Sequence, residues 1–447
     1  MEGRTHRPVW REERCGACAV CVGGCPAFVF ADLADETDTK RGRMAQGLAG
    51  VEPAQATPPC RAACPIGQDI PGYLDRLAQG DQAGALEIIL KDNPLPGVLG
   101  HVCNHPCQGA CASAVVQAPP QVRELKRFAA LAPRPPVPPP TGAVRGQAAV
   151  IGSGPAGLTA AWELAKAGVK VTIFEAEPVL GGMLAWSIPS FRLPREVLAQ
   201  DLAYIAAHGV EMVANRRVEP GEVRAWLAQG QGVILACGAP RAQKADLRGA
   251  HLPGVHWGLD FLKACALDCA PQLKAPVVVV GGGNVALDAA RWALRLNNDV
   301  TLVYRRDREQ MPAYAEEVAE ARSEGLKLAF RLQPLAIEGD SQGLTGLRCQ
   351  ATAPGQPGPD GRVVYAPQPG QEQMVSAGAV ILALGQETAA ADWAQGLGLK
   401  GFQPQGPGRL ARGLHAAGDL VTGPATVVQA MAGGRQAALA LIQELWS

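Results

Sequence analysis

The sequence has no run of eighteen or more apolar residues, and no apolar core follows the basic residues at its N-terminus. These absences argue against a membrane-spanning helix and against a secretion signal. Net charge is also absent, because 41 lysines and arginines balance 41 aspartates and glutamates. No overall basic field therefore favours nucleic acid or an anionic membrane. We expect a cytoplasmic protein whose binding surfaces are local.

Two kinds of catalytic signature are missing as well. The body of the chain contains neither the C-x2-C nor the C-x4-C spacing of an active disulfide, which argues against a thioredoxin- or glutathione-type reductase. Cys237 is expected to be buried packing after a strand, and Cys265 and Cys269 receive no role. No serine–histidine pair or amidotransferase cysteine is visible, so substrate chemistry is expected to belong to another subunit.

Cysteine is abundant near the start of the chain, where nine of the thirteen cysteines fall in the first 111 residues. In a reducing compartment such clustering favours metal over a disulfide framework. The stretch "CGACAVCVGGCP" has the spacing C-x2-C-x2-C-x3-C followed by proline, which is typical of an iron–sulfur cluster. The alternative is a zinc knuckle, although zinc sites more often pair two C-x2-C elements a dozen or more residues apart. The cysteines of this first group are Cys15, Cys18, Cys21 and Cys25.

A second group of cysteines offers five thiolates where a cluster needs four. His101 and His105 lie among them, and we expect these histidines to orient a loop or to bond to a sulfur, not to ligate iron. The cysteines of this second group are Cys60, Cys64, Cys103, Cys107 and Cys111.

The composition and the hydrophobic pattern of the chain change twice along its length. Helical spacing of leucine and isoleucine predicts a helical head with loops that carry the cysteines. The stretch "LAPRPPVPPPTGAVRG" is too rich in proline for a helix or a central strand, and it predicts a surface spacer. After it, short β-branched runs alternate with glycine turns and alanine-rich helical stretches, which is the rhythm of a parallel sheet. The expected fold class is α/β with a helical head.

The first nucleotide motif lies in "AAVIGSGPAGLTAAWELAKAGVKVTIFEA". Gly152, Gly154 and Gly157 form G-x-G-x-x-G between an apolar strand and a helix, so the helix N-terminus is expected to face a pyrophosphate. Glu175 ends the next strand, where a carboxylate can accept hydrogen bonds from a ribose.

A second motif follows in "APVVVVGGGNVALDAARWALRLNNDVTLVYRR". Here Gly281, Gly283 and Ala286 take the three small-residue positions. The second strand ends in Arg305 and Arg306 instead of an acid, which favours a 2′-phosphate and hence NADP(H). If these arginines only form a solvated turn, NAD(H) is the alternative.

Two such folds, one inside the other, indicate a flavin reductase whose first fold continues after the insert. The stretch "AVILALG" is expected to be a strand of that continuation, and "LHAAGDLVTGPATVVQAMAGGRQAALALIQEL" a strand, a loop and the closing helix. Asp419 is expected to bind the ribityl or phosphate part of FAD. The helix N-terminus near Thr426 is expected to face the flavin pyrimidine edge and to stabilise reduced anionic flavin.

Several stretches together resemble a known family, the pyridine-nucleotide oxidoreductases typified by the small subunit of bacterial glutamate synthase. The N-terminal half of dihydropyrimidine dehydrogenase and the large subunit of the NADH-dependent ferredoxin:NADP oxidoreductase are similar. The resemblance covers roughly residues 58 to 447. It rests on "CRAACPIGQDIPGYL", "NPLPGVLGHVCNHPCQGAC", "LKRFAA", "GGMLAWSIPSFRLP", "GGGNVALDAA", "VYRRDREQMPA" and "AAGDLVTGPATVVQAM".

This resemblance implies an iron–sulfur head on two glutathione-reductase-like (Rossmann-like) domains, the second inserted in the first. It implies FAD at a set of loop and strand-end residues: Gly152, Ser153, Gly154, Pro155, Ala156, Gly157, Glu175, Gly182, Met183, Leu184, Gly418, Asp419 and Thr426. Together with the second motif it implies NADP(H) at Gly281, Gly282, Gly283, Asn284, Arg305 and Arg306.

The expected domains follow from these motifs. They are a ferredoxin-like cysteine segment at 1–50, a helical iron–sulfur domain at 51–130, a proline-rich linker at 131–146, an FAD-binding domain at 147–248 and 375–447, and an NAD(P)H-binding domain at 249–374.

The head departs from the resembled family in two ways. Members with two clusters usually carry a C-x2-C shortly before the position of Cys60, where this chain has "GVEPAQATPP". Some relatives also use a polar side chain from the helix matching "LKRFAA", but the matching residues here are Lys126 or Arg127, and cations make poor iron ligands. Cysteines must then complete the cluster, and exchange of ligands between the two cysteine groups stays open. Nine cysteines suit two [4Fe–4S] clusters with one spare.

The expected function is that of a diaphorase-type, FAD-dependent NAD(P)H oxidoreductase. It would pass electrons between NAD(P)H, FAD and the clusters, to or from a catalytic or ferredoxin-like partner subunit in a hetero-oligomeric complex. Glutamate synthase and a metal-dependent aldehyde or formate oxidoreductase are candidate complexes. The alternatives are a free-standing NADPH:ferredoxin oxidoreductase, bifurcating or not, and an assembly subunit that binds flavin without turnover.

Overall fold

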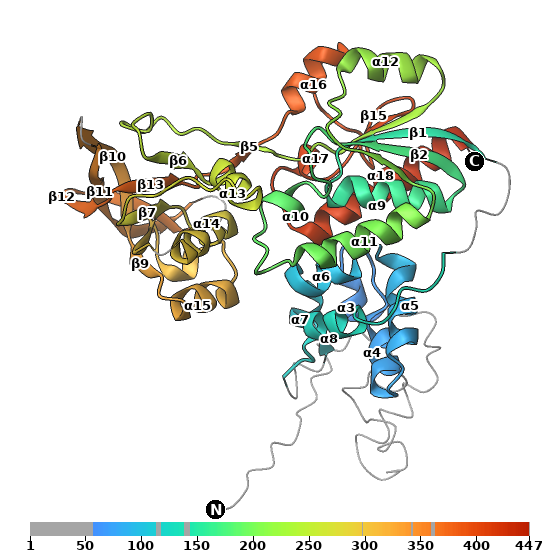
Figure 1. The fold of residues 1–447 in the computed structure, drawn as a ribbon, viewed down its shortest axis with the longest axis horizontal. Helices are drawn as coiled ribbons and strands as arrows, with labels where there is room; N and C mark the ends of the chain where they lie inside the picture. The colour runs from blue at the N-terminus through green and yellow to red at the C-terminus, as the bar shows by residue number, and fades with distance from the viewer. Residues whose placement is uncertain are drawn as a thin grey trace, which may run out of the picture.

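A computed structural model describes residues 57–112, 118–137, 144–296, 298–340, 343–358 and 363–446. Cys15, Cys18, Cys21 and Cys25 lie outside these residues, and so does the expected segment 1–50. Within the described part, the chain forms a helical head and two units that are each built on a parallel sheet (Figure 1). No helix of that part is both long and apolar enough to cross a membrane.

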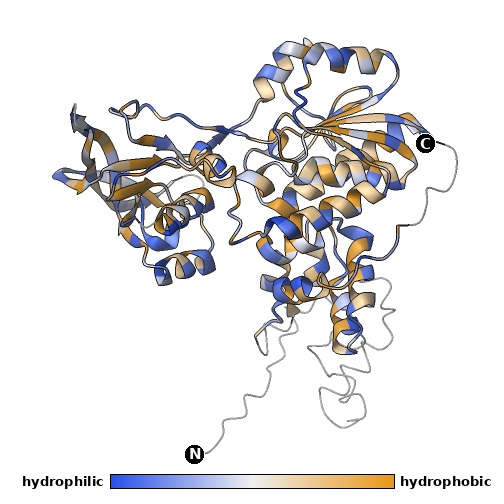
Figure 2. Ribbon diagram, viewed as in Figure 1, coloured by the Kyte–Doolittle hydropathy of each residue, from blue (hydrophilic) through white to orange (hydrophobic). Residues whose placement is uncertain are grey.

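The head consists of short helices, several of which begin at a proline or an aspartate. Asp69 accepts a hydrogen bond from Gly72 N at the start of α4, and Asp81 accepts one from Gly84 N at the start of α5. In Figure 2 the helices of the head carry both hydrophilic and hydrophobic residues, as expected of helices with one buried face. The helices are α3 (Pro59–Ala62), α4 (Ile70–Ala78), α5 (Gln82–Asp92), α6 (Pro96–Val102), α7 (Pro106–Gly109) and α8 (Val122–Ala129).

The first unit is a six-stranded sheet in the order β15-β16-β4-β1-β2-β3. All neighbouring strands are parallel except β15 and β16. Its strands are β1 (Gly146–Ile151), β2 (Val169–Phe174), β3 (Glu211–Val213), β4 (Gly232–Leu235), β15 (Arg409–Ala411) and β16 (Leu414–Ala416). Its helices are α9 (Pro155–Lys166), α10 (Met183–Trp186), α11 (Arg195–Ala207), α12 (Pro220–Ala228), α16 (Ala390–Leu397), α17 (Asp419–Thr422) and α18 (Val427–Trp446).

The second unit is a five-stranded parallel sheet in the order β6-β13-β7-β8-β9. Its strands are β6 (Val255–Trp257), β7 (Val277–Val280), β8 (Val300–Tyr304), β9 (Lys327–Phe330) and β13 (Ala379–Leu382), and its helices are α13 (Gly258–Ala266), α14 (Asn284–Arg295), η5 (Arg308–Gln310) and α15 (Ala315–Ser323). An antiparallel sheet of β10 (Leu332–Asp340), β11 (Gly343–Pro357) and β12 (Val363–Ser376) extends it. The antiparallel pair β5 (Arg241–Ala242) and β14 (Gln386–Glu387) lies where the chain leaves and re-enters the first unit.

The strand β13 differs from its expected place. The sequence analysis assigned it to the first nucleotide-binding fold, whose second part was expected to start at residue 375, but it pairs with β7 and β6 of the second sheet. Its four residues are all buried. A buried apolar strand suits the centre of either parallel sheet, so its composition carries no information about which sheet it joins.

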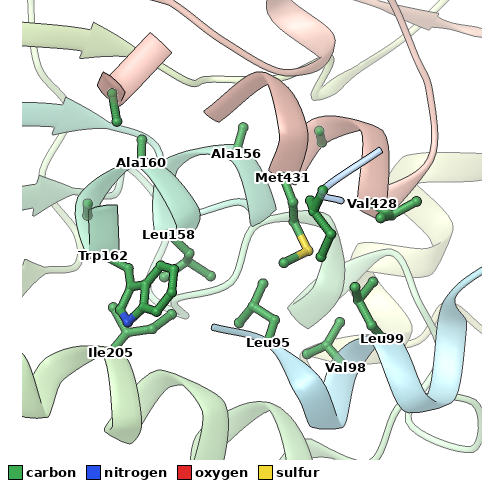
Figure 3. Packing of buried hydrophobic residues seen from close by; sticks show 14 of the residues in the cluster. Leu95, Val98, Leu99, Ala156, Leu158, Ala160, Trp162, Ile205, Val428 and Met431 are labelled. Atoms are coloured by element: carbon green, nitrogen blue, oxygen red, sulfur yellow. The ribbon is translucent and has the colours of Figure 1, made fainter. Parts of the chain in front are cut away.

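The head and the first unit share one hydrophobic core (Figure 3). Leu95, Val98 and Leu99 of the head lie against Met431 and Val428 of α18 in this core. Burial of apolar surface on this scale is the main force that holds the two parts together. The head is therefore packed as part of the first unit and not attached by its linker alone.

A buried carboxylate fixes the angle at which α6 meets this core. Asp201 of α11 is fully buried and accepts a hydrogen bond of 2.9 Å from Val98 N, in the first turn of α6. Arg134, in the segment that follows the head, forms an ion pair with the same carboxylate. Burial raises the pKa of Asp201 to about 6, and Arg134 and the N–H groups of α6 oppose that rise. Asp201 of the first unit thus holds both α6 of the head and the segment that follows the head.

We predict that Asp201→Ala lowers the free energy of unfolding by about 3 kcal/mol, because it leaves a half-buried arginine and buried N–H groups without an acceptor. Urea unfolding followed by circular dichroism measures this change. The control is Asp75→Ala on the exposed face of α4, for which we expect a change within about 0.5 kcal/mol. Equal unfolding midpoints for the two variants would contradict the anchoring role of Asp201.

Candidate functional site

The first glycine loop joins β1 to α9 in the geometry that its spacing predicts. Gly152 has φ +106°, and a Cβ there would lie 2.5 Å from Ala236 O, so only glycine fits this turn. A Cβ on Gly157 would collide with Gly152 O, which shows how closely the helix packs on the loop. By contrast, a Cβ on Gly154 would meet nothing within 4 Å. The helix therefore begins at an open space bordered by bare backbone.

The end of β2 is tied to this loop through Glu175. Its Oε2 accepts hydrogen bonds from Ser153 N at 2.9 Å and Ser153 Oγ at 2.6 Å, and its Oε1 accepts one from Glu177 N at 3.0 Å. Ser153 Oγ in turn accepts a hydrogen bond from Gly181 N. Glu175 is thus held rigidly where the sequence places a ribose ligand, at the carboxyl edge of the sheet.

Asp419 provides a test of whether a ligand fits here. Its Oδ1 is buried and has no hydrogen-bond partner in the described structure. Burial raises the pKa of this carboxyl to about 6. An unsatisfied buried acceptor is costly, and a hydroxyl-bearing ligand would satisfy it. Asp419 is the first residue of α17, on the wall of the cavity described next, where the sequence analysis expects the ribityl or phosphate part of FAD.

A cavity of about 490 Å³ connects these groups. The FAD-assigned residues on its wall are Gly152, Gly154, Pro155, Ala156, Glu175, Gly182, Met183, Leu184, Asp419 and Thr426. The other assigned residues of the first unit, Ser153, Gly157 and Gly418, support the loops behind that wall. The structure therefore brings together the separated motifs of the first unit around one space.

The same cavity is lined by residues of the other two parts of the protein. Asn284, Asp288 and Tyr314 come from the second unit, and Val102 comes from the head. Val102 is the last residue of α6 and directly precedes Cys103. A group bound in this cavity would contact all three parts of the chain.

A buried ion pair, which the sequence analysis did not identify, closes the cavity between the two units. Arg192 of the first unit donates to Asp288 Oδ2 at 2.7 Å and to Glu317 Oε1 at 2.6 Å. Burial raises the pKa of Asp288 to about 6, against the lowering effect of Arg192. Next to it, the guanidinium of Arg295 lies 3.7 Å from the ring centroid of Phe191. No spacing pattern indicates such a contact, because its partners are about a hundred residues apart.

The second glycine loop joins β7 to α14 in the same way. Gly281 has φ +148°, and a Cβ on Gly283 would meet nothing within 4 Å, as at Gly154. A Cβ on Gly282 would collide with the ring of Tyr304, so the end of β8 is packed on the loop. Asn284 begins the helix, and its Oδ1 accepts a hydrogen bond from Tyr314 N at 3.2 Å.

The two arginines expected to bind a 2′-phosphate follow β8 directly. Their backbone is fixed, because Arg305 O accepts a hydrogen bond from Thr352 Oγ1 and Arg306 O accepts one from Arg331 N. The Arg305 side chain is exposed and that of Arg306 half-buried. Within the described residues, neither guanidinium has a carboxylate partner. Both can therefore turn toward a phosphate.

Four of the five cysteines in the head lie near one buried tyrosine. Tyr73 is fully buried, and burial together with the charges of Cys107, Cys103, Cys64 and Cys60 raises its pKa. Cys64, Cys103 and Cys107 lie in the shared core with it. Cys111 follows α7 and is half-buried. Among the described residues, no three His, Cys, Asp or Glu side chains are grouped closely enough to hold a single metal ion.

The histidines near these cysteines have the supporting roles that the sequence analysis expected. His101 Nδ1 donates to Gly97 O at 2.8 Å, within α6. The backbone N–H of His105 donates to Cys103 Sγ at 3.4 Å, and its ring Nε2 lies 2.9 Å from Glu316 Oε1 of α15. Of the two α8 residues at the position where some relatives have a polar ligand, Lys126 is buried and Arg127 is exposed. Only Lys126 therefore faces the interior of the head.

Two family models match the chain. Residues 146–434 match the model of pyridine nucleotide-disulphide oxidoreductases, which is well over half of the chain. The chain belongs to this family. Residues 54–134 match dihydropyrimidine dehydrogenase domain II, a 4Fe–4S cluster domain. FAD, a nicotinamide dinucleotide and a 4Fe–4S cluster are the cofactors of these two families, so the protein is an FAD-dependent NAD(P)H oxidoreductase with an iron–sulfur domain, as the resemblance implied.

Individual relatives of this oxidoreductase are similar over most of the chain. The beta subunit of NADP(+)-dependent formate dehydrogenase from Moorella thermoacetica is 38% identical, with 90% of this chain and 62% of the relative covered. The small chain of NADPH glutamate synthase from Halomonas elongata is 32% identical, with 87% and 88% covered. The chain spans less than two thirds of the length of several curated relatives that it matches.

Among solved structures, Mycobacterium tuberculosis FprA in complex with NADPH has the same fold. It is 19% identical, the superposition has a TM-score of 0.58, and 67% of this chain and 84% of that chain are covered. This likeness concerns the two sheet-based units, and it confirms the expected α/β fold with two nucleotide-binding units.

The open space beside Gly154 leads to a prediction about FAD. We predict that Gly154→Val abolishes FAD binding while the protein still folds, because the added Cβ enters the cavity with no other atom of the chain within 4 Å. Flavin absorbance after purification and the circular dichroism spectrum are measured together. The control is Gly221→Val on α12, where a Cβ has no neighbour closer than 3.8 Å and faces no cavity residue. A folded, yellow Gly154→Val protein would show that the site is misassigned.

Proposed function

We propose that this oxidoreductase carries electrons between NADPH and a partner subunit, through bound FAD and two [4Fe–4S] clusters. The observation that supports this most directly is the shared cavity. Its wall combines the FAD loop, Asn284 and Tyr314 of the second unit, and Val102, which precedes Cys103. When bound, FAD exchanges hydride with a nicotinamide and electrons singly with an iron–sulfur cluster. The residues for both exchanges therefore lie around one space.

The chain's own residues would divide the work as follows. The backbone of Gly154 and the N-terminus of α9 bind the pyrophosphate of FAD, Glu175 the ribose, and Asp419 the ribityl chain or phosphate. Thr426 directly precedes α18, and its N–H and hydroxyl both donate to Gln429 Oε1, which fixes the helix end that would face the flavin. In the second unit, the Gly281–Asn284 loop binds the dinucleotide phosphates, and Arg305 and Arg306 select NADPH.

The clusters would be held by the two cysteine groups. Cys60, Cys64, Cys103 and Cys107, which lie near Tyr73, provide the four thiolates of the head cluster. The other thiols, Cys15, Cys18, Cys21, Cys25 and Cys111, provide the second cluster and the one spare. Clustered thiolates of this kind suit a reducing compartment, and we propose the cytoplasm.

A partner subunit would complete the reaction. The relatives from Moorella thermoacetica and Halomonas elongata are named as subunits of a formate dehydrogenase and a glutamate synthase. The described part of this chain has a cavity suited to cofactors but no assigned residues for a further substrate. Size-exclusion chromatography from the native source tests this proposal, and elution as a single free chain would favour a free-standing NADPH:ferredoxin oxidoreductase.

The assignment of Arg305 and Arg306 predicts nucleotide selectivity. We expect the double variant Arg305→Ala, Arg306→Ala to raise KM for NADPH about 100-fold and to leave KM for NADH nearly unchanged, because the lost contacts are to the 2′-phosphate. Steady-state diaphorase activity with both nucleotides measures this. Arg322→Ala, an exposed arginine of α15, is the matched control. A similar loss for both nucleotides would refute the 2′-phosphate contact.

The cysteine assignment predicts which steps fail when a cluster is removed. Cys107→Ser and Cys18→Ser should each lower the iron content by about four atoms per chain, while flavin bleaching by NADPH persists in both. Iron analysis, stopped-flow absorbance and reduction of the native partner are measured on the same preparations. Cys265→Ser, at a buried cysteine of the second unit, should keep all its iron.

Three outcomes would count against this scheme. Normal partner reduction by iron-depleted protein would mean that electrons leave by another route. Zinc in place of iron in the N-terminal segment of the wild-type protein would support a zinc knuckle there. A protein in which NADPH neither bleaches flavin nor reduces viologen would instead be an assembly subunit.

A further inference from the structure

Lys126 is a buried cation at the cysteines of the head. Its residue exposure is 3%, which is unusual for lysine. It lies on the buried face of α8 with Val122 and Ala129, each about one turn away on either side. These two residues belong to the same core as Cys64, Cys103 and Cys107. The hydroxyl of Tyr73, the residue that the cysteines lie near, also donates to Val122 O of this helix.

The packing of α8 leaves little room for Lys126 to turn elsewhere. The helix crosses α6 at Gly100, where a Cβ would lie 2.7 Å from the Cα of Arg127. This close approach brings α8 against the helix that ends at Cys103. The Arg127 side chain points to the outside and pairs with Glu124 at 3.5 Å. Two neighbouring cations of one helix thus have opposite surroundings.

No carboxylate of the described residues pairs with the Lys126 ammonium. The acidic groups nearby are engaged by other cations, because Glu124 pairs with Arg123 and Arg127, and Glu316 pairs with Arg123 and His105. The helix that carries Lys126 packs on α4 and on α6, and α6 ends next to Cys103. A buried ammonium without a counter-ion is expensive, so an anion is expected beside it. A thiolate-ligated cluster provides that anion.

We propose that Lys126 sets the reduction potential of the head cluster by placing a fixed positive charge beside it. This proposal rests on the proposed function, in which Cys107 is a ligand. A cluster with four thiolates is anionic and gains a further negative charge when it accepts an electron. A nearby ammonium stabilises the reduced state more than the oxidised state, which raises the potential. Lys126 is a positioning charge in this scheme and not a ligand.

The consequence concerns the direction of electron flow. A higher potential at the head cluster makes it a better acceptor of electrons from the cavity side. Removal of the charge makes that transfer less favourable without altering the residues that line the cavity. The effect therefore appears in the cluster potential and not in NADPH or FAD binding.

The test is an EPR-monitored redox titration of the full-length protein in the Cys18→Ser background, which isolates the head cluster. We compare Lys126→Gln and Lys126→Arg, and use Arg127→Gln as the control one residue away. Lys126→Gln should lower the reduction potential of the head cluster by at least about 59 mV. For one electron, that shift is a tenfold change in the ratio of oxidised to reduced cluster. Lys126→Arg should keep most of the potential, and Arg127→Gln should shift it by less than a third as much. Iron content should be the same in all of them.

Two results would overturn the inference. An unchanged potential in Lys126→Gln with full iron would show that the charge does not act on the cluster. Loss of iron in Lys126→Gln would show that the side chain holds the cluster or the fold, not its potential. Absence of any head-cluster signal before Lys126 is changed would refute the proposed function itself, so the two failures are distinguishable.

Discussion

The fully buried carboxylate of Asp201 is the interaction on which the arrangement of this oxidoreductase depends. It accepts N–H groups of α6 at one end of that helix, and Cys103 lies at the other end. Val102 meanwhile reaches the cavity wall. A shift of α6 would move the cysteines away from the cavity, so a structural anchor sets a functional distance. The shared core of Leu95, Val98 and Met431 then makes the placement rigid.

The second unit contacts the other two parts of the protein largely through charged side chains. Arg192 pairs with Asp288 and Glu317 beside the cavity. Glu316 pairs with Arg123 of the head, and His105 Nε2 of the head lies 2.9 Å from its Oε1. Charge pairs at partly buried interfaces specify orientation more than they add stability. The second unit is thus aligned with the first unit and with the helical head at the same time, through the neighbouring residues 316 and 317 of α15.

The buried charges and unsatisfied groups mark where ligands belong. Asp419 Oδ1 has no partner, and Lys126 has no carboxylate. Each of them is costly in the protein alone, and under the proposed function a hydroxyl of FAD would satisfy the first and an anionic cluster the second. The two glycine loops leave room for a ligand as well, because the backbone at Gly154 and Gly283 borders open space.

The sequence by itself determined the family, the cofactor classes and the two glycine loops, because these depend on local spacing: a tight turn, a helix N-terminus and a strand-end side chain lie within about twenty-five residues of one another. It could not determine which sheet takes β13, since an apolar strand suits either one. Nor could it distinguish Lys126 from Arg127, because only the packing of α8 on α6 decides which side chain turns inward. The tertiary structure alone joined Arg192 to Asp288 and Val102 to the cavity, since contacts between distant segments leave no periodic signal in the sequence.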